Sequence, residues 1–329
     1  MVLFRFNNRF FYVISVLCAL SFWMSFSNLV QTTPMLPLPP YPSYIYAIKD
    51  RKEQKKAKLQ QFRELVECHL SAKYPASYLA LPSKAHPHIV RVATYNIHGW
   101  RAPENEQNNT KRTEDFANIM GVIKNMNADV LILQEAEFSL PETYAILQSL
   151  GYGHTVFVGE SRIDGKYGNM IASKIPFVTR PLKKIFSCGG PNSKRSYAKV
   201  EIAFNAKEKN NLVLYATHLD YQDSKMRLLQ VQELSNIIAV HESGKNVIIG
   251  ADFNEHIGPA IKHLGSRGFI NSFDLAGVAR PLFTHWSAQP IDAFYIKRSD
   301  WNLWITGTYL VYSGKSDHLP IVMDIDPTR

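Results

Sequence analysis

Polar side chains follow apolar, β-rich runs at four places in this 329-residue chain. NVIIGAD ends at Asp252, with Asn254 two residues further on; HIVRVATYN ends at Asn96, ADVLILQE at Glu135 and NLVLYATH at His218. Runs of this kind predict buried strands. Strands that deliver oxygen and imidazole groups at one end are a common way to assemble a site on a rigid scaffold.

These residue types predict a site for a divalent cation and a phosphate. Glu135 and Asp252 offer anionic oxygens, whereas Asn96 and Asn254 offer neutral amides. Mg²⁺ is usually held by one or two carboxylates, while water and substrate phosphate fill its other positions. Residues two apart in an extended chain point to the same side. Asp252 and Asn254 can therefore serve a metal and a phosphate or nucleophile together.

Three residues near the C-terminus extend the candidate site. Asp317 and His318 precede a last apolar run in SGKSDHLPIVMDI, and Asp292 begins another in QPIDAFYIK. Neighbouring residues of an extended chain point to opposite faces, so we expect Asp317 and His318 to serve different partners. A carboxylate such as Asp292 can orient a histidine ring and stabilise its protonated form.

Seven short motifs in chain order resemble the endonuclease/exonuclease/phosphatase superfamily, which includes pancreatic-type deoxyribonuclease, apurinic endonucleases, neutral sphingomyelinases and inositol-polyphosphate 5-phosphatases. They lie between about residues 89 and 326: TYNIHGW, LILQEAE, YGNMIASKIP, YATHLDYQ, GADFNE, IDAFYI and SDHLPI. The resemblance implies an α/β fold, a four-layer sandwich of two stacked mixed β-sheets flanked by helices. It also implies a hydrolase of phosphate esters that uses Mg²⁺ or Mn²⁺.

The resemblance assigns a metal role to three residues. Glu135 would bind the ion, Asn96 would contact the metal or phosphate, and Asp317 would lie near the metal. Two departures stand out. The YNIHGW loop lacks the acidic residue that some nuclease branches place after the asparagine, and Ala251 separates Gly250, which we expect to make the turn, from the aspartate.

The other candidates would act on the substrate. Asp252 and Asn254 would position the attacking water and bind the phosphate. His218 would stabilise the phosphoryl oxygens or help the leaving group. His318 would be the general base, and Asp292 would orient a histidine.

Several polar residues have a simpler interpretation. Asn169 fits either a phosphate contact or a turn. We expect surface or turn positions for six histidines: His98, His154, His241, His256, His263 and His285. The basic segment 183–199 fits a solvated hairpin better than a grip on an anionic substrate. DSKMRLLQVQELSNIIAV has the apolar spacing of a helix packed on the core.

Charge is unevenly distributed along the chain. The total is +9, but from residue 90 onward 26 Lys or Arg face 24 Asp or Glu, which leaves only +2. The sequence pI of 9.3 therefore gives little support to nucleic-acid binding. The substrate alternatives are DNA or RNA for a nuclease and a lipid head group for a sphingomyelinase-like phosphodiesterase; a catalytically inactive interaction domain is the third reading.

The first 30 residues predict membrane attachment or export. Residues 10–30 are uncharged and follow Arg5 and Arg9, so 1–30 predicts a hydrophobic membrane anchor or a signal peptide. Residues 31–85 predict a Pro-rich spacer and a basic helix, and 86–329 the catalytic domain. We expect a membrane-anchored or secreted monomer whose catalytic domain lies on the exported side.

Overall fold

The computed structural model describes residues 53–61, 64, 81–105, 109–137, 141–160, 165–189, 194–205, 210–298 and 304–327. The predicted anchor at 1–30 and most of the predicted spacer lie outside these residues. Within them, no helix combines the length and the apolar character that a bilayer crossing requires.

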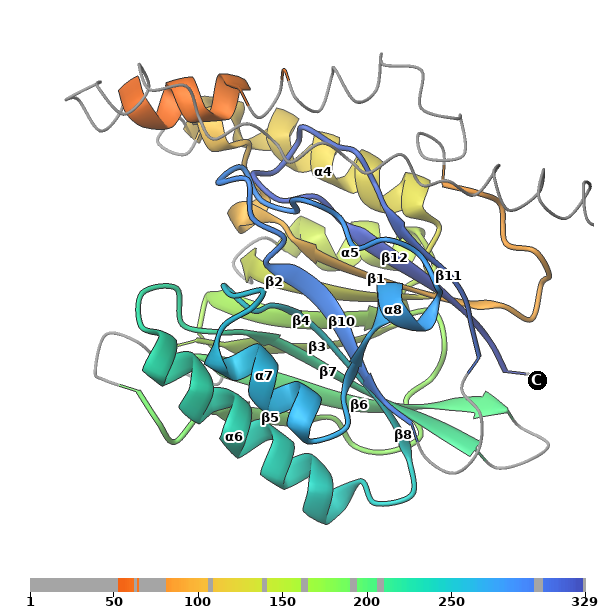
Figure 1. Ribbon diagram of the computed structural model, residues 1–329. Helices are drawn as coiled ribbons and strands as arrows, with labels where there is room; N and C mark the ends of the chain where they lie inside the picture. Colours follow the sequence, from red (N-terminus) through yellow and green to blue (C-terminus); the bar gives the residue numbers. More distant parts are fainter. Residues whose placement is uncertain are drawn as a thin grey trace, which may run out of the picture. The chain divides into compact units, whose positions relative to one another are not determined.

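Two six-stranded sheets form the body of the catalytic region (Figure 1). In the first sheet only β1 and β2 are parallel, and the other neighbours are antiparallel. Its strand order is β11 (Trp304–Leu310), β12 (Ile321–Asp326), β1 (Val90–Asn96), β2 (Val130–Glu137), β4 (Tyr167–Ser173) and β3 (His154–Gly159).

The second sheet repeats this mixed pattern. Only β7 and β8 are parallel, and the other neighbours are antiparallel. Its strand order is β5 (Leu182–Ile185), β6 (Ser196–Asn205), β7 (Asn210–His218), β8 (Asn246–Asp252), β10 (Asp292–Lys297) and β9 (Ile270–Asn271).

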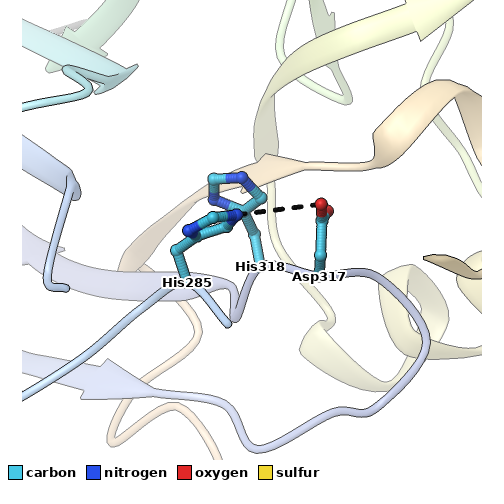
Figure 2. Close-up of side chains that lie close together, drawn as sticks. All are labelled: His285, Asp317 and His318. Atoms are coloured by element: carbon cyan, nitrogen blue, oxygen red, sulfur yellow. Dashed lines mark ion pairs between the residues drawn. The ribbon is translucent and has the colours of Figure 1, made fainter. Parts of the chain in front are cut away.

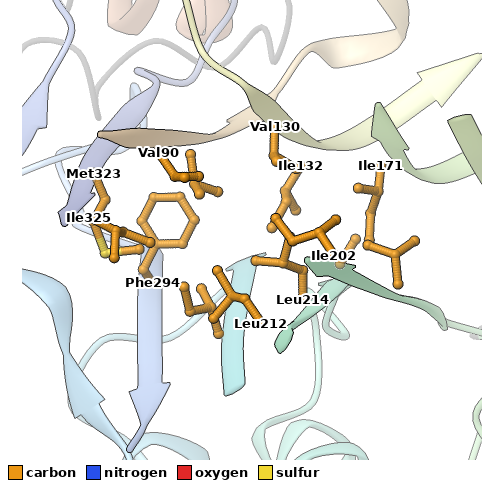
Figure 3. Close-up of a cluster of buried hydrophobic side chains, with 14 of the residues drawn as sticks. Val90, Val130, Ile132, Ile171, Ile202, Leu212, Leu214, Phe294, Met323 and Ile325 are labelled. Atoms are coloured by element: carbon orange, nitrogen blue, oxygen red, sulfur yellow. The ribbon is translucent and has the colours of Figure 1, made fainter. Parts of the chain in front are cut away.

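The inner faces of the two sheets share one apolar core (Figure 3). Val130 and Ile132 of β2 and Leu212 and Leu214 of β7 are all fully buried in it. Side chains alternate between the two faces of a strand, so alternate residues of β2 and β7 enter this layer. Burial of such side chains is the main favourable contribution to the stability of the stack.

The intervening residues of the same strands pack against helices. Leu131 and Leu133 lie in a cluster with α4 (Arg112–Met126) and α5 (Pro141–Ser149). On the other sheet, side chains of β7 and β8 pack against α6 (Ser224–His241) and α7 (Pro259–Ser266). The predicted arrangement of two stacked mixed sheets flanked by helices is therefore confirmed (Figure 1).

Short helices complete the connections. They are η2 (His98–Trp100), η3 (Pro103–Asn105), η4 (Asn109–Lys111) and α8 (Ser272–Leu275). The predicted core-packing helix is α6, which begins where the carboxylate of Asp223 accepts a hydrogen bond from the Lys225 backbone N–H (2.8 Å). This cap satisfies one of the donors that the first helical turn leaves unpaired.

Two local predictions about the strand ends need correction. The strand that carries Glu135 does not stop there: β2 continues to Glu137 through a shift in register between Leu133 and Ala136. Gly250 does not make a turn; it lies inside β8. A Cβ at this position would come within 2.9 Å of a methyl carbon of Ile132, so the glycine is required by the close packing of the two sheets.

Candidate active site

The strand directions bring the polar strand ends together. β7 and β8 are parallel and end side by side, which pairs His218 with Asp252. β10 runs antiparallel to β8 and begins where β8 ends, which pairs Asp292 with Asp252. Asp252 is therefore flanked within the sheet by an imidazole on one side and a carboxylate on the other.

The Asp252 carboxylate is the centre of this group and is almost fully buried. Its Oδ2 accepts a hydrogen bond from the Asn96 side-chain amide (3.1 Å), which belongs to the other sheet. The same oxygen lies 3.4 Å from Nε2 of His218 and 3.6 Å from Nε2 of His318. Burial alone would raise the pKa of Asp252, but the positive charges of the two histidines outweigh it and lower the pKa. The carboxylate is thus held in its ionised form.

His318 is paired with a second buried carboxylate. Its Nδ1 lies 2.8 Å from Oδ2 of Asp292, and the Asp292 backbone N–H donates to Oγ1 of Thr284 (2.9 Å). Burial opposes the charged imidazolium, but the charges of Asp292 and Asp252 prevail and raise the pKa of His318 to about 10. Burial raises the pKa of Asp292 to about 6. At neutral pH the pair therefore consists of an imidazolium and a carboxylate.

His218 connects Asp252 to Arg195 and Glu160, two residues that we did not predict from the sequence. Its Nε2 lies 3.0 Å from the side-chain nitrogen of Asn254. On the other side of the ring, Nδ1 lies 3.2 Å from the Arg195 guanidinium and 3.4 Å from the Glu160 carboxylate. Arg195 also donates to Glu160 (2.6 Å). The site thus contains a buried cation that a phosphate could use.

Arg195 lies in the segment that we expected to be a solvated hairpin. The guanidinium is instead buried, and its pKa is raised because the charge of Glu160 outweighs the effect of burial. The run SKRSYAK was the only sequence signal for this residue. Composition could not distinguish the buried arginine in it from the lysines on either side.

An unusual backbone conformation sets the direction of the Glu135 side chain. This residue lies in the irregular part of β2 with φ at +56°, a conformation that non-glycine residues rarely adopt. Extra residues in a strand often redirect a side chain next to an active site. One carboxylate oxygen of Glu135 accepts a hydrogen bond from the Tyr167 hydroxyl, and the other lies 3.9 Å from Nδ1 of His218.

The surroundings of Tyr167 show that this part of the site is anionic. Burial and the charges of Glu135, Glu160 and Asp317 all raise the pKa of Tyr167, so its phenol stays neutral among three carboxylates. Oxygen donors with this excess of negative charge fit a divalent cation. Glu135 and Asp317 supply carboxylates, and Asn96 supplies an amide oxygen, which accepts from the His98 backbone N–H (3.1 Å).

Asp317 forms an ion pair with His285 (Figure 2), whereas the ring of its neighbour His318 contacts Asp292. Oδ2 of Asp317 lies 3.8 Å from Nε2 of His285 and 3.9 Å from Nε2 of His98. Burial would raise the pKa of Asp317, but the charge of His98 and the contact with His285 outweigh it and lower the pKa. The His285 and His318 rings lie 4.4 Å apart.

Two of the six histidines expected at surface or turn positions do lie in turns, but not on the surface. The side chains of His98 and His285 are only 15% and 16% exposed. Both contact Asp317 and face the candidate site. Burial and the charge of His318 lower the pKa of His285. By contrast, His241 is exposed at the end of α6, as expected, and His263 contacts Ser235 of that helix (3.0 Å).

Asn169 does not occupy a turn. It is a fully buried residue of β4, and its side-chain amide donates to the backbone oxygen and hydroxyl of Ser196 (3.1 and 3.0 Å). Ser196 begins β6 in the other sheet. Asn169 thus ties the two sheets together beside the strand ends.

Comparison with known proteins identifies the family. The model of the Endonuclease/Exonuclease/phosphatase family matches residues 93–318, while no curated protein matches. Among solved structures, the human Nocturnin catalytic domain with bound sulfate anion is 18% identical and aligns over 74% of this chain and 95% of its own, with a TM-score of 0.61.

Two further structures share the fold. A functionally unknown conserved protein from Enterococcus faecalis V583 is 18% identical, over 72% of this chain and 99% of its own, with a TM-score of 0.59. D. rerio TDP2 complexed with single strand DNA product is 15% identical, over 72% and 98%, with a TM-score of 0.58. The structural superpositions show a shared fold, and the family match spans more than half of the sequence. This chain therefore belongs to the endonuclease/exonuclease/phosphatase family.

Proposed function

We propose that the chain is a metal-dependent phosphodiesterase in which water attacks phosphorus. Members of the family are hydrolytic enzymes that act on phosphate esters. The observation that carries the proposal is the buried, ionised carboxylate of Asp252, which lies within 3.6 Å of one imidazole nitrogen each from His218 and His318. A fixed anion beside two imidazoles can hold a water molecule and a phosphate at once.

Asp252 orients the attacking water and accepts its proton. A general base must begin unprotonated, and Asp252 meets this requirement because its pKa is lowered. His318, which the family resemblance assigned as the base, does not meet it at neutral pH because its pKa is raised to about 10. As an imidazolium held by Asp292, His318 instead donates to a phosphoryl oxygen and offsets the charge that develops there.

His218, Asn254 and Arg195 form the other side of the phosphate site. The Asn254 amide and the Arg195 guanidinium each lie near a different nitrogen of the His218 ring. All three groups can donate hydrogen bonds to phosphoryl oxygens. A divalent ion held by Glu135, with Asn96 and Asp317 nearby, would add Lewis-acid polarisation of the phosphate.

We propose a chemical class of substrate from the N-terminal segment and the net charge of the catalytic domain. The N-terminal segment 1–30, proposed to anchor or export the protein, favours a lipid head group at a bilayer. The net charge of +2 from residue 90 onward gives less support to a nucleic acid. We therefore place a lipid phosphodiester first and a nuclease activity on DNA or RNA second.

A direct comparison of substrates tests this proposal. Full-length protein would be assayed with Mg²⁺ and with Mn²⁺ on sphingomyelin, phosphoinositides, single-stranded DNA, duplex DNA and RNA. We expect hydrolysis of at least one phosphodiester, and a loss of roughly 10² to 10⁴-fold in Asp252→Asn, the usual contribution of general-base catalysis. A folded wild-type protein that hydrolyses none of them, or an Asp252→Asn variant with unchanged rate, would overturn the proposal.

A further inference from the structure

The backbone of Asn254, whose amide is proposed to meet the phosphate, needs support from its surroundings. Its φ is +50°, a left-handed conformation that non-glycine residues adopt rarely and keep where other contacts fix it. Its backbone N–H donates to Oδ1 of Asp252 (2.9 Å), and its side-chain amide donates to the backbone oxygen of Leu219 (3.1 Å). The direction of the amide therefore depends on two chain segments, 252–255 and 218–220.

Arg227 of α6 joins these two segments. Its Nε donates to Oε2 of Glu255 (2.9 Å), and one of its terminal nitrogens donates to the backbone oxygen of Asp220 (3.0 Å). Glu255 directly follows Asn254, and Asp220 directly follows Leu219. A guanidinium presents its donors in a fixed plane, so one side chain sets the spacing between the two segments.

The ion pair between Arg227 and Glu255 is largely shielded from water. The two side chains are only 12% and 7% exposed, and salt screens such a pair much less than a pair on the surface. The second carboxylate oxygen of Glu255, Oε1, accepts a hydrogen bond from the backbone N–H of Ala260 at the start of α7 (2.7 Å). Glu255 is therefore held by α6 and α7 together.

Asp220 is held by several contacts besides the one with Arg227. Its backbone N–H donates to the buried side chain of Gln230 (2.9 Å). Its carboxylate accepts from two backbone N–H groups of the turn that follows (2.9 and 2.7 Å). Arg227 and Gln230 lie three positions apart on α6 and so on the same side of the helix. One side of α6 thus fixes the segment after β7.

Gly258 leaves room for the Glu255 carboxylate. A Cβ at this position would lie 2.2 Å from the carboxylate carbon. The backbone of Gly258 has φ −81° and ψ −168°, an extended conformation that other residues also adopt. Glycine is therefore required here by the position of the carboxylate and not by the backbone, and a larger residue would displace the flexible end of Glu255.

We propose that Arg227 and Glu255 are positioning residues for the hydrolytic reaction. Their ion pair sets the spacing between the segment after β7 and the segment after β8, and so holds the Asn254 amide where it meets a phosphoryl oxygen. Neither side chain touches the substrate, since each acts through Asn254. The inference rests on the proposed function, because it takes Asn254 to be a phosphate ligand.

A double-mutant cycle tests the inference. The full-length protein would be assayed with Mg²⁺ on bis-p-nitrophenyl phosphate as the wild type, Arg227→Gln, Asn254→Ala and the double variant. We expect Arg227→Gln to lower kcat by roughly 10²-fold, the usual cost of misplacing a group by about 1 Å. The double variant should be little slower than Asn254→Ala, because both changes remove the same contact, whereas independent effects would multiply.

A second variant tests the ion pair without removing either of its residues. Gly258→Ala should fold and lower kcat, because the added Cβ displaces the Glu255 carboxylate. Gly265→Ala is its control in α7, since nothing lies within 4 Å of the added Cβ. Arg267→Gln is the control for the loss of an arginine, because Arg267 is exposed and donates to Asn236 (3.3 Å). Both controls should keep the wild-type kcat.

Wild-type kcat in Arg227→Gln and Gly258→Ala, or losses that multiply in the double variant, would overturn the inference. Hydrogen exchange in ¹⁵N-asparagine-labelled protein gives a result that does not depend on hydrolysis. The backbone N–H of Asn254, identified by the loss of its signal in Asn254→Ala, must exchange faster in Gly258→Ala and at the wild-type rate in Gly265→Ala. Faster exchange in a protein that hydrolyses no phosphodiester contradicts the proposed function alone. Hydrolysis that neither Arg227→Gln nor Gly258→Ala slows contradicts this inference alone.

Discussion

At the scale of single residues, the site is a set of charged groups that hold one another in defined protonation states. Asp252 is kept ionised by histidines, and His318 is kept protonated by Asp292 and Asp252. Each group would behave differently alone, because burial by itself favours the uncharged form of both. The chemistry therefore belongs to the cluster rather than to any one side chain.

The pKa of His318 leads to a stability test. The folded pKa of about 10 lies above the ordinary 6.5, so the stabilisation from protonated His318 is fully present below about pH 6.5 and is lost as the pH rises toward 10. Urea unfolding of the wild type and His318→Gln should show a difference in free energy that changes across this window. The exposed control His241→Gln should show none. A His318 difference that stays constant from pH 6 to about 10 would mean that its pKa is not raised.

The raised pKa of His318 also predicts how the rate of hydrolysis depends on pH. If the imidazolium is the active form, the rate should hold through neutral pH and fall as the pH approaches 10. If His318 were a base with an ordinary pKa, the rate would instead fall below about pH 6.5. Measurement of kcat against pH with Mg²⁺ present separates the two roles, and an acidic limb that disappears in His318→Ala would restore the general-base assignment.

At the scale of elements, close packing between the two sheets positions the strand ends. Gly250 of β8 faces Ile132 of β2 and Phe294 of β10, with a Cβ position only 2.9 Å from each. We expect Gly250→Ala to destabilise the protein by about 1 to 3 kcal/mol, the usual cost of overpacking. Thermal or urea unfolding measures this change.

A matched glycine gives the control. Gly121 lies inside α4 with nothing within 4 Å of its Cβ position. Gly121→Ala should therefore be neutral or stabilise by about 0.5 to 1 kcal/mol, because alanine favours helix. An equal loss of stability in both variants would show that the inter-sheet contact is not the cause.

A buried ion pair joins the first and last strands of the described catalytic region. Arg91 of β1 donates to both carboxylate oxygens of Asp324 in β12 (2.6 and 2.7 Å), and the side chains are only 3% and 5% exposed. We expect Asp324→Ala to cost about 3 to 5 kcal/mol, because it leaves an uncompensated buried cation. The double variant Arg91→Met/Asp324→Leu should recover most of this loss in urea unfolding. A double variant as unstable as the single one would contradict the explanation.

At the scale of the whole molecule, the two sheets meet at a site that an ion should stabilise. An ion that binds only the folded protein raises its stability by about 2.7 kcal/mol at a concentration 100 times its Kd. We expect Mg²⁺ or Mn²⁺ to raise the Tm of the wild type and a chelator to abolish hydrolysis. Glu135→Gln should lose most of the Tm increase, because it removes one of the negative charges around the proposed ion.

An exposed glutamate provides the control for this measurement. Glu114 is 63% exposed on α4, so Glu114→Gln should keep the full increase in Tm. A Mg²⁺ effect that is the same in Glu135→Gln and Glu114→Gln, or full activity in excess chelator, would remove Glu135 from the metal site.

The sequence by itself determined the strands and which residues stand at their ends. Asn96, His218 and Asp252 end β1, β7 and β8 as predicted, because apolar alternation and the polar residue that stops it are both local signals. The motifs in chain order were enough to identify the family. Position along one strand, however, says nothing about which other strand lies opposite.

Tertiary structure alone decided which side chains meet. Register at the sheet edge placed Asp292 opposite Asp252, a bulge turned Glu135 toward Tyr167, and the left-handed loop at His98 carried its ring to Asp317. Arg195 and His285 had no distinguishing sequence neighbours. Their burial and partners come from segments far away in the chain, and contacts of that kind depend on strand crossover and packing rather than on local periodicity.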